Sequence, residues 1–388
     1  MADQEAPSHA LPDVAGHSFV LLPVGPARLD AVVRMIGEAK ASVRLLFYIF
    51  IDDASGRRVR DALLAAHRRG VAVSLLVDGF GSKDTPDEFF APLDGSDAYF
   101  CRYEPTRGRR YLLRNHQKLV IADEKRAIVG GFNIEDCYFA ERGDPKGWRD
   151  LGLALEGPAA TRLAAYFDAL AEWAQRKRSK VKEVRRFLYR FTEQDGDVRW
   201  LLGGPTNDLS PWANSLRLAL ARASRADIVA AYFAPYWAFL RLLRGVAERG
   251  SARVITASRS DNNATIAAAR NRYQYLLPGV RIYEYQPMML HTKLYVVDDT
   301  VYLGSANFDT RSLYLNLELM IRVRDAGFAA AMRRYVDGEA ADSDEITPEE
   351  YAASQTLWTR IKGRLSYLLI SVLDYNISRR LNFGIDGD

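Results

Sequence analysis

Two short stretches of the chain carry the same spacing of histidine, lysine and aspartate. They are residues 115–123 (NHQKLVIAD) and residues 290–298 (LHTKLYVVD). The histidine and the lysine of each stretch are two residues apart, so on a β-strand both side chains point to the same face. The apolar run after each lysine is typical of a buried strand, and the aspartate falls where that strand turns. The predicted catalytic residues of the two motifs are His116, Lys118, Asp123, His291, Lys293 and Asp298.

These side chains suit the transfer of a phosphodiester group. Two lysine ammoniums and two amides that converge on the phosphoryl oxygens would stabilise a pentacoordinate transition state. One imidazole can attack phosphorus and form a phosphohistidine. The other can protonate the departing alkoxide and then deprotonate the incoming alcohol. A Gly-Gly/Ser-x-Asn element after each motif supplies the amides, Asn133 and Asn307. The sequence has no metal-ligand cluster, so we predict neither a metal nor another cofactor.

The two motifs lie in halves of the chain that repeat each other. Residues 65–82 (AAHRRGVAVSLLVDGFGS) align with residues 245–262 (GVAERGSARVITASRSDN). A single His-x-Lys pair is weak evidence of function, whereas one copy in each repeat favours a catalytic role. Short apolar strands alternate with helical patterns, which indicates βαβ units. We therefore predict an α/β fold with two pseudo-symmetric lobes, each a mostly parallel sheet flanked by helices.

The composition divides the 388 residues into five predicted parts. A disordered or extended tail (1–17) precedes the first lobe (18–174), and a basic linker (175–197) leads to the second lobe (198–340). A helical C-terminal tail (341–388) follows. The linker contains RKRSKVKEVRR, which is either a solvated helix face or an anion-binding surface. Two cysteines without metal-ligand spacing favour a reducing compartment. We expect no secretory signal and no spanning helix, so any work on membranes is expected from their surface.

The chain resembles the phospholipase D superfamily, and bacterial cardiolipin synthases in particular, from about Phe19 to Tyr335. Residues 296–319 (VVDDTVYLGSANFDTRSLYLNLEL) are similar to the synthase pattern of GSxN followed by RS-x3-N-x-E. Residues 147–160 (GWRDLGLALEGPAA) resemble the segment after the first synthase motif. The matching positions of the second half are Gly304, Ser305, Asn307, Arg311, Ser312, Asn316 and Glu318, and Asp150 is the acidic residue of the first half.

The resemblance implies roles for several of these residues. Asp150 and Glu318 are expected to orient the imidazoles by hydrogen bonding to the far ring nitrogen. Asp123 and Asp298 are expected to be structural partners near the site. By family tendency His116 is the nucleophile and His291 the general acid and base. The first half has Gly131 where the second has Ser305, so one hydroxyl donor is missing. The predicted substrate-binding residues are Gly131, Ser305, Arg114 and Tyr48.

Two stretches suit an anionic lipid surface. Residues 100–114 mix aromatic side chains with arginines directly before the first motif, and arginine favours phosphate recognition. Residues 357–373 carry an apolar run that is too short to span a bilayer. A helix there either docks on the core or lies in the membrane interface. The expected location is cytoplasmic, peripheral to the inner face of a bacterial membrane.

The leading predicted function is a phosphatidyl transfer that joins phosphatidylglycerol to a second phosphatidylglycerol or another phospholipid. The alternatives are a hydrolytic phospholipase D, a nuclease of the same superfamily and a catalytically silent lipid-binding protein. No extended basic groove with stacking aromatics is visible, so no nucleic-acid partner is expected. The predicted partners are a phospholipid and an anionic membrane surface. One chain carries both motifs, so an oligomer is not required for catalysis.

Overall fold

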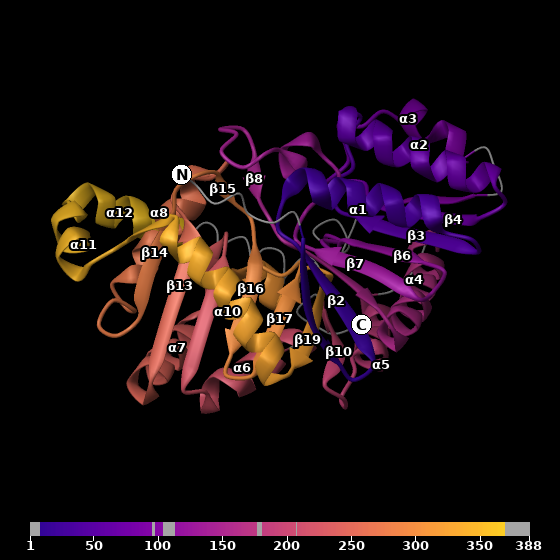
Figure 1. Ribbon diagram of the computed structural model, residues 1–388. Coiled ribbons are helices and arrows are strands. Elements are labelled where there is room, and N and C mark those ends of the chain that lie inside the picture. The colour runs from indigo at the N-terminus through magenta and orange to yellow at the C-terminus, as the bar shows by residue number, and fades with distance from the viewer. Residues whose placement is uncertain (1–7, 95–97, 104–112, 177–180, 207, 369–388) are drawn as a thin grey trace.

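The fold consists of two lobes, each built around an eight-stranded sheet (Figure 1). The computed structural model describes residues 8–94, 98–103, 113–176, 181–206 and 208–368. The strand order of the first sheet is β1-β2-β9-β7-β6-β3-β4-β5 and that of the second is β10-β19-β17-β16-β11-β13-β14-β20. Seven consecutive positions of the two orders correspond, from β2 with β10 to β5 with β14. This correspondence confirms the predicted pair of α/β lobes.

The strands of the first sheet are β1 (His9–Val14), β2 (His17–Leu22), β3 (Ser42–Phe47), β4 (Ala72–Asp78), β5 (Tyr99–Tyr103), β6 (Leu119–Ala122), β7 (Arg126–Gly130) and β9 (Gly152–Glu156). Those of the second sheet are β10 (Val198–Gly203), β11 (Arg225–Ala230), β13 (Ser251–Ala257), β14 (Arg281–Tyr285), β16 (Lys293–Val297), β17 (Thr300–Gly304), β19 (Glu318–Arg324) and β20 (Ser343–Glu345).

The prediction that the sheets are mostly parallel is wrong. Only β3-β4-β5 and β11-β13-β14 run parallel, and the other neighbours in both sheets are antiparallel. The reason is the connection between strands. A helix links β3 to β4, but a tight turn links β6 to β7, with Asp123 and Glu124 at φ values of 53° and 57°. Such a turn can join only antiparallel neighbours.

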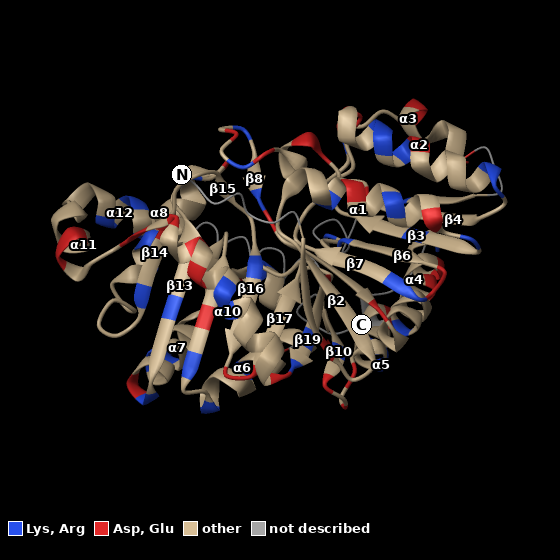
Figure 2. Cartoon of the chain, in the orientation of Figure 1, with Lys and Arg blue, Asp and Glu red and all other residues tan. Residues whose placement is uncertain are grey.

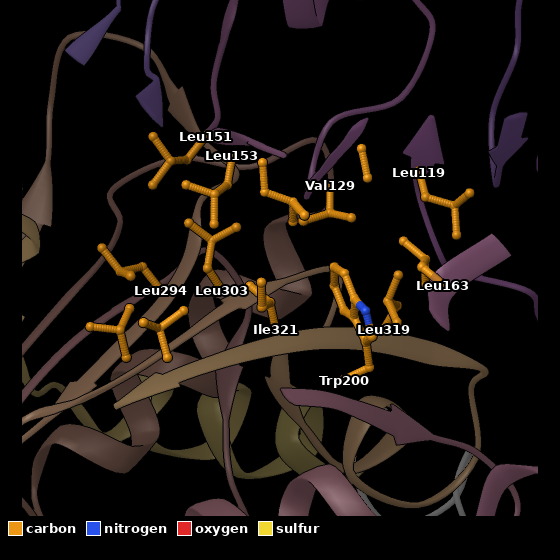
Figure 3. Close-up of a cluster of buried hydrophobic side chains, with 14 of the residues drawn as sticks. Leu119, Val129, Leu151, Leu153, Leu163, Trp200, Leu294, Leu303, Leu319 and Ile321 are labelled. Atoms are coloured by element: carbon orange, nitrogen blue, oxygen red, sulfur yellow. The ribbon is translucent and has the colours of Figure 1, made fainter. Parts of the chain in front are cut away.

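The two sheets pack face to face and helices cover their outer faces. The outer face of the first sheet buries apolar residues against α1 (Gly25–Glu38), α2 (Ala54–Arg68) and α3 (Asp87–Asp94). Helices α6 (Pro211–Arg222), α7 (Trp237–Arg249) and α8 (Asn263–Tyr273) do the same for the second. Between the sheets, Leu119, Val129 and Leu153 face Leu294, Leu303 and Ile321 (Figure 3). Because this core is shared, the two lobes are held as one body.

Three helices complete the shared core at its margins. They are α4 (Pro158–Gln175), α5 (Val181–Phe191) and α10 (Ala326–Ala341). The predicted basic linker therefore contains a helix, α5, whose Val184 and Leu188 are fully buried in the shared core. The linker was predicted from its positively charged residues. The same segment also has apolar residues spaced four apart, and these form the buried side of the helix.

The predicted N-terminal tail is also partly integrated. Residues His9–Val14 form the edge strand β1, which pairs antiparallel with β2. His17 is 4% exposed, and its Nε2 accepts a hydrogen bond from the amide of Ala159 in the first turn of α4. This imidazole thus accepts a hydrogen bond from one of the backbone amides that have no partner within the helix at its N-terminus.

The C-terminal tail adds β20, then α11 (Pro348–Ser354) and α12 (Leu357–Tyr367). Residues 369–388 and 104–112, on which parts of the lipid-surface predictions fall, lie outside the described residues. Among the residues that are described, no helix is both long enough and apolar enough to cross a bilayer.

Candidate active site

The two motifs meet where the lobes exchange backbone hydrogen bonds. The amide of His116 donates to the carbonyl of Leu317, 2.9 Å away, and the amide of His291 donates to the carbonyl of Arg149 at 2.7 Å. A two-residue strand before the second motif, β15 (Met289–Leu290), also pairs in parallel with β8 (Trp148–Arg149) of the first lobe. Figure 1 shows β8 and β15 side by side between the lobes. Each histidine is therefore positioned by both halves of the chain.

Each imidazole bonds to a carboxylate from the opposite lobe. His116 Nδ1 lies 3.1 Å from Oε2 of Glu318, and His291 Nδ1 lies 2.6 Å from Oδ2 of Asp150. Both carboxylate side chains are completely buried. A carboxylate at Nδ1 keeps the ring proton there and leaves Nε2 with its lone pair. This geometry is the one expected for Asp150 and Glu318, with the pairing crossed between the lobes.

The Glu318 carboxylate is held by side chains of the segment that leads into β19. Its Oε1 accepts a hydrogen bond from the Ser312 hydroxyl at 2.7 Å and one from the Asn316 amide at 3.5 Å. Its Oε2 accepts from the hydroxyl of Ser305. Ser312 lies on the short helix α9 (Thr310–Tyr314). The serines and the asparagine of this motif therefore fix the carboxylate that orients His116.

Gly131 gives Asp150 the room that Ser305 takes up in the other half. A Cβ at position 131 would lie 2.6 Å from Oδ1 of Asp150 and 2.9 Å from Cδ of Lys293. The Ser305 hydroxyl bonds to Glu318 and accepts from the amide of Leu319 at 3.0 Å. The hydroxyl that the first half lacks at Gly131 is thus engaged with a carboxylate in the second half. A substrate-binding role of Gly131 and Ser305 remains a prediction.

We expect Gly131→Ala to lower kcat by about 10- to 100-fold, because the added methyl displaces the Asp150 carboxylate from His291. Overpacking of this kind costs about 1–3 kcal/mol of stability, which differential scanning calorimetry measures. The matched control is Gly37→Ala in α1, where a Cβ meets nothing within 4 Å. Full activity of Gly131→Ala would show that Asp150 tolerates displacement.

The two lysines of the motifs are buried beside their histidines. Lys118 Nζ donates to the carbonyl of His116 at 2.6 Å, and Lys293 Nζ lies 2.8 Å from Nδ1 of His291. Burial lowers the pKa of Lys118 well below its usual range, against the attraction of Glu318. Burial likewise lowers the pKa of Lys293 to about 8, opposed by Asp150 and Glu318. When both lysines are protonated, their charges balance those of the two buried carboxylates.

Both catalytic imidazoles are neutral at neutral pH. Burial first, and then the charge of Lys118, lower the pKa of His116. Burial and the neighbouring Lys293 lower the pKa of His291 to about 3, although Asp150 opposes the shift. A neutral imidazole has the free electron pair that nucleophilic attack requires. A bound phosphate anion would raise the pKa of both rings and help one of them to hold a proton.

Aromatic rings surround the two histidines unequally. Tyr48 lies edge-on to His116 at 5.1 Å between ring centroids. Around His291 lie Trp148 at 5.0 Å, Tyr138 at 5.1 Å and Tyr232 at 6.0 Å. The sequence prediction included Tyr48 and missed the other three. The repeat points to the neighbourhood of Tyr232, because it is the second residue after β11 and Tyr48 is the first residue after β3.

The two asparagines that follow the motifs are not equivalent. Asn133 is buried, its Oδ1 accepts from the amide of Ile49, and its Nδ2 donates to the hydroxyl of Tyr138 at 2.9 Å. Asn307 is also buried, and its Oδ1 has no hydrogen-bond partner within the described part of the chain. Asn133 thus supports a ring beside His291, and a direct role of either amide at the phosphate stays a prediction.

The aspartates of the motifs lie away from the histidines, at the other end of their strands. Asp123 accepts the amides of Lys40, Ala41 and Ser42, while Asp298 accepts those of Ser224 and Arg225. Asp123 lies five positions after Lys118 along an extended chain, which is roughly 16 Å. The prediction that these aspartates belong to or lie near the site is wrong. They fix the turns between strands.

Two polar groups anchor the segment that precedes the first motif. Asp78 accepts the amide of Asn115 at 2.8 Å, and burial raises the pKa of its carboxyl to about 6. Arg114 is 8% exposed, and its guanidinium carbon lies 3.9 Å from the ring centroid of Phe80. Asp78 is the last residue of the buried strand β4, a signal that the sequence prediction did not use. A substrate-binding role of Arg114 and Tyr48 remains a prediction.

Two buried arginines hold the segment between β8 and β9 that carries Asp150. Arg28 is fully buried and donates to the carbonyl of Asp150 at 2.6 Å and to that of Tyr138 at 2.5 Å. Arg149 forms a buried ion pair with Glu339 of α10 and donates to the carbonyl of Pro23. Sequence reasoning missed both. Their contacts tie Asp150 to the first lobe and to the second.

A family model and curated relatives agree on one family, and a solved structure shares its fold. The family described as "Cardiolipin synthase, PLD-like domain" matches residues 32–170 and 216–339. Cardiolipin synthase B of Shigella flexneri is 31% identical over 371 residues, which cover 91% of this chain and 87% of the relative. Cardiolipin synthase A of Pseudomonas putida is 31% identical over 373 residues, which cover 94% and 76%. A phosphatidylserine synthase structure from Haemophilus influenzae Rd KW20 has the same fold, with a TM-score of 0.70, 12% identity and 96% coverage of both chains.

Proposed function

The chain belongs to the cardiolipin synthase family of the phospholipase D superfamily, and from this membership we propose that its crossed histidine–carboxylate pairs transfer a phosphatidyl group between phospholipids. The membership supports a phosphatidyltransferase activity of the cardiolipin synthase type. The observation that carries the proposed mechanism is the pairing of His116 with Glu318 and of His291 with Asp150 across the two lobes. It supplies two oriented imidazoles in one site without any further group.

In the proposed first step, Nε2 of His116 attacks the phosphorus of phosphatidylglycerol. The bond from phosphorus to the headgroup glycerol breaks. His291, which takes up a proton at Nε2 when the anionic phosphate binds, gives that proton to the glycerol as it leaves. The product is a phosphatidyl group bonded to His116. His116 is the more exposed of the two side chains, at 12% against 4% for His291, which favours it as the ring that meets the donor phosphate.

In the second step a hydroxyl of another phosphatidylglycerol takes the place of the departed glycerol. His291 accepts the hydroxyl proton, the oxygen attacks phosphorus, and the bond to His116 breaks. Cardiolipin and free enzyme result. Lys118 and Lys293 stabilise the negative charge that builds on the phosphoryl oxygens in both steps. Glu318 and Asp150 keep the proton of each imidazole on Nδ1 in both steps.

Transfer is favoured over hydrolysis by the surroundings of His291. Three aromatic rings, those of Trp148, Tyr138 and Tyr232, pack around it. Packed rings leave little space for loosely held water beside the base that activates the acceptor. An alcohol tethered to a lipid has a binding advantage over water in such a site. We propose that the reaction takes place at the inner face of a bacterial membrane, and that one chain suffices.

Lipid product analysis by mass spectrometry tests this function. Purified protein is incubated with phosphatidylglycerol vesicles, with and without phosphatidylethanolamine or glycerol, and the lipids are identified over time. Cardiolipin that accumulates with the wild type and not with His116→Ala is the expected result. Phosphatidic acid as the sole product would reassign the protein as a hydrolase. No lipid turnover, together with cleavage of DNA or RNA, would reassign it as a nuclease.

We expect kcat/KM to fall as the pH rises above about 8. The pKa of Lys293 is lowered to about 8 by burial, so its positive charge is present below that pH and lost above it. Loss of the charge removes stabilisation of the phosphoryl oxygens. A p-nitrophenyl phosphodiester substrate needs no proton for its leaving group, so an alkaline decline that persists with it belongs to the lysine and not to His291. A profile that stays flat to pH 10 would contradict this assignment.

A further inference from the structure

We propose that helix α12 is a membrane-docking element that lies on the surface of an anionic bilayer and brings the active site to its lipid substrate. The inference rests on the proposed lipid function. The residues that it assigns to contact with the bilayer lie outside the catalytic machinery. The inference combines the two alternatives for the C-terminal helix, because one side of α12 docks on the protein and the other is proposed to face lipid.

The side of α12 that faces the protein is formed by small residues. Gly363 packs on α8 so closely that a Cβ there would lie 3.2 Å from Cβ of Asn271 and 3.3 Å from the carbonyl oxygen of Ala267. Ser366 is 7% exposed. The guanidinium carbon of Arg272 lies 3.5 Å from the ring centroid of Tyr367 at the end of the helix. Close backbone packing and a cation–π contact therefore dock α12 without its large apolar side chains.

The large apolar side chains of α12 point away from the protein. At 3.6 residues per turn they occupy an arc of about 100°, opposite to Gly363 and Ser366. A helix docked on a soluble core normally turns such a stripe inward. A contiguous exposed apolar stripe of this kind is a mark of an interaction surface. Its members are Leu357 (77% exposed), Trp358 (72%), Ile361 (40%), Leu365 (53%) and Leu368 (42%).

Charge complementarity identifies the occupant as an anionic lipid surface. Arg360 and Arg364 lie along one border of the apolar stripe and Lys362 along the other, and α12 contains no acidic residue. Figure 2 shows the cations of α12 and, on the neighbouring α11, acidic residues. Of those acids, Glu350 bonds to Thr347 in a capping box. An apolar stripe bordered by cations is the pattern of a helix that lies in the headgroup region, with long side chains reaching the phosphates.

The surface continues toward the active site. Tyr236 and Trp237, at the start of α7, are 52% and 44% exposed, and Trp237 packs edge-on against Tyr275. Tyr236 lies four positions after Tyr232, whose ring contacts His291. Aromatic side chains with a polar edge suit the boundary between lipid tails and water. We infer that these exposed aromatic side chains extend the docking surface from α12 toward the segment that carries Tyr232.

Vesicle sedimentation tests the docking surface without catalysis. The full-length chain carrying His116→Ala is mixed with vesicles of phosphatidylcholine alone or with 30 mol% phosphatidylglycerol added, in amounts on the order of those that saturate binding. We expect Leu365→Glu to weaken binding to the anionic vesicles by about tenfold or more. The matched control is Leu218→Glu on α6, a leucine of similar exposure at 47%, which should bind normally. Exchange of Arg360, Lys362 and Arg364 for Gln should remove the preference for anionic vesicles.

Activity measurements separate a failure of the docking surface from a failure of the proposed function. With catalytic histidines intact, Leu365→Glu should turn over a short-chain, monomeric phosphatidylglycerol at the wild-type rate and vesicle substrate at least about tenfold more slowly. Wild-type vesicle binding by Leu365→Glu would overturn the docking proposal even if cardiolipin forms. Sedimentation velocity tests whether a second copy of the chain covers the apolar stripe. If the wild type is a dimer, and Leu365→Glu dissociates it without changing vesicle binding, the stripe is a dimer interface. Vesicle binding that depends on α12 in a protein with no lipid turnover would support docking and refute the transferase.

Discussion

His116→Ala is expected to abolish the phosphatidyl-enzyme with every substrate, because it removes the proposed nucleophile. His291→Ala is expected to lower turnover of phosphatidylglycerol by at least about 10⁴-fold and still to form the covalent intermediate from an activated substrate. A p-nitrophenyl phosphodiester supplies such a substrate, because its leaving group departs without a proton. The measurement is the burst of nitrophenol per mole of enzyme, with the mass of the intact protein as a second readout. His291→Ala should give one equivalent and then stop.

The histidine variants also have clear contrary outcomes. A burst from His116→Ala and none from His291→Ala would exchange the two roles. Near-normal turnover of natural substrate by either variant would refute a mechanism with two histidines. His67→Ala, on the outer helix α2, is the matched control and should behave as the wild type. The thermal unfolding midpoint of each variant shows whether the fold survives.

Neutralising the two buried acids should separate the two half-reactions in the same way. Glu318→Gln is expected to slow formation of the phosphatidyl-enzyme by about 10²- to 10⁴-fold, because the amide no longer fixes the tautomer of His116. Asp150→Asn should reduce turnover of phosphatidylglycerol by a similar factor and leave the nitrophenol burst intact, because it acts through His291. The crossed assignment comes from distances of 3.1 and 2.6 Å between the lobes.

Asp123→Asn is the control for these carboxylates. Asp123 accepts three backbone amides at the far end of its strand, so its variant should lower the unfolding midpoint and leave the burst and kcat nearly unchanged. A loss of the burst in Asp150→Asn would show that Asp150 also acts on the attacking histidine. A large catalytic defect in Asp123→Asn would reinstate the motif aspartates as part of the site.

The repeat and the two motifs predicted the lobes and the central residues because those signals are local and duplicated. The direction of the strands could not be predicted as well, since the alternation of helix and strand describes only the first part of each lobe. The tight turns at Asp123 and Asp298, which make the later strands antiparallel, depend on side chains that cap distant amides. The order of helices and strands predicted from the sequence does not reveal these contacts.

The sequence did not identify residues whose role depends on contacts with residues far away in the chain. Arg28 and Arg149 look like ordinary surface residues of a helix and a strand, and only the packing of the lobes buries them. Trp148 lies near His291 because β8 pairs with β15, which are about 140 residues apart in the chain. The exposed face of α12 also required the structure, because apolar periodicity does not say which side of a helix is covered.

The crossed pairing has a consequence for the ancestry of the chain. In a dimer of identical half-length polypeptides, every histidine would receive its carboxylate from the other subunit, so neither subunit could work by itself. Fusion of two such copies into one gene would preserve that dependence and free the halves to diverge. They have diverged: one uses an aspartate beside a glycine, and the other a glutamate locked by a serine hydroxyl. Each half of the present chain depends on the other for the carboxylate that orients its histidine.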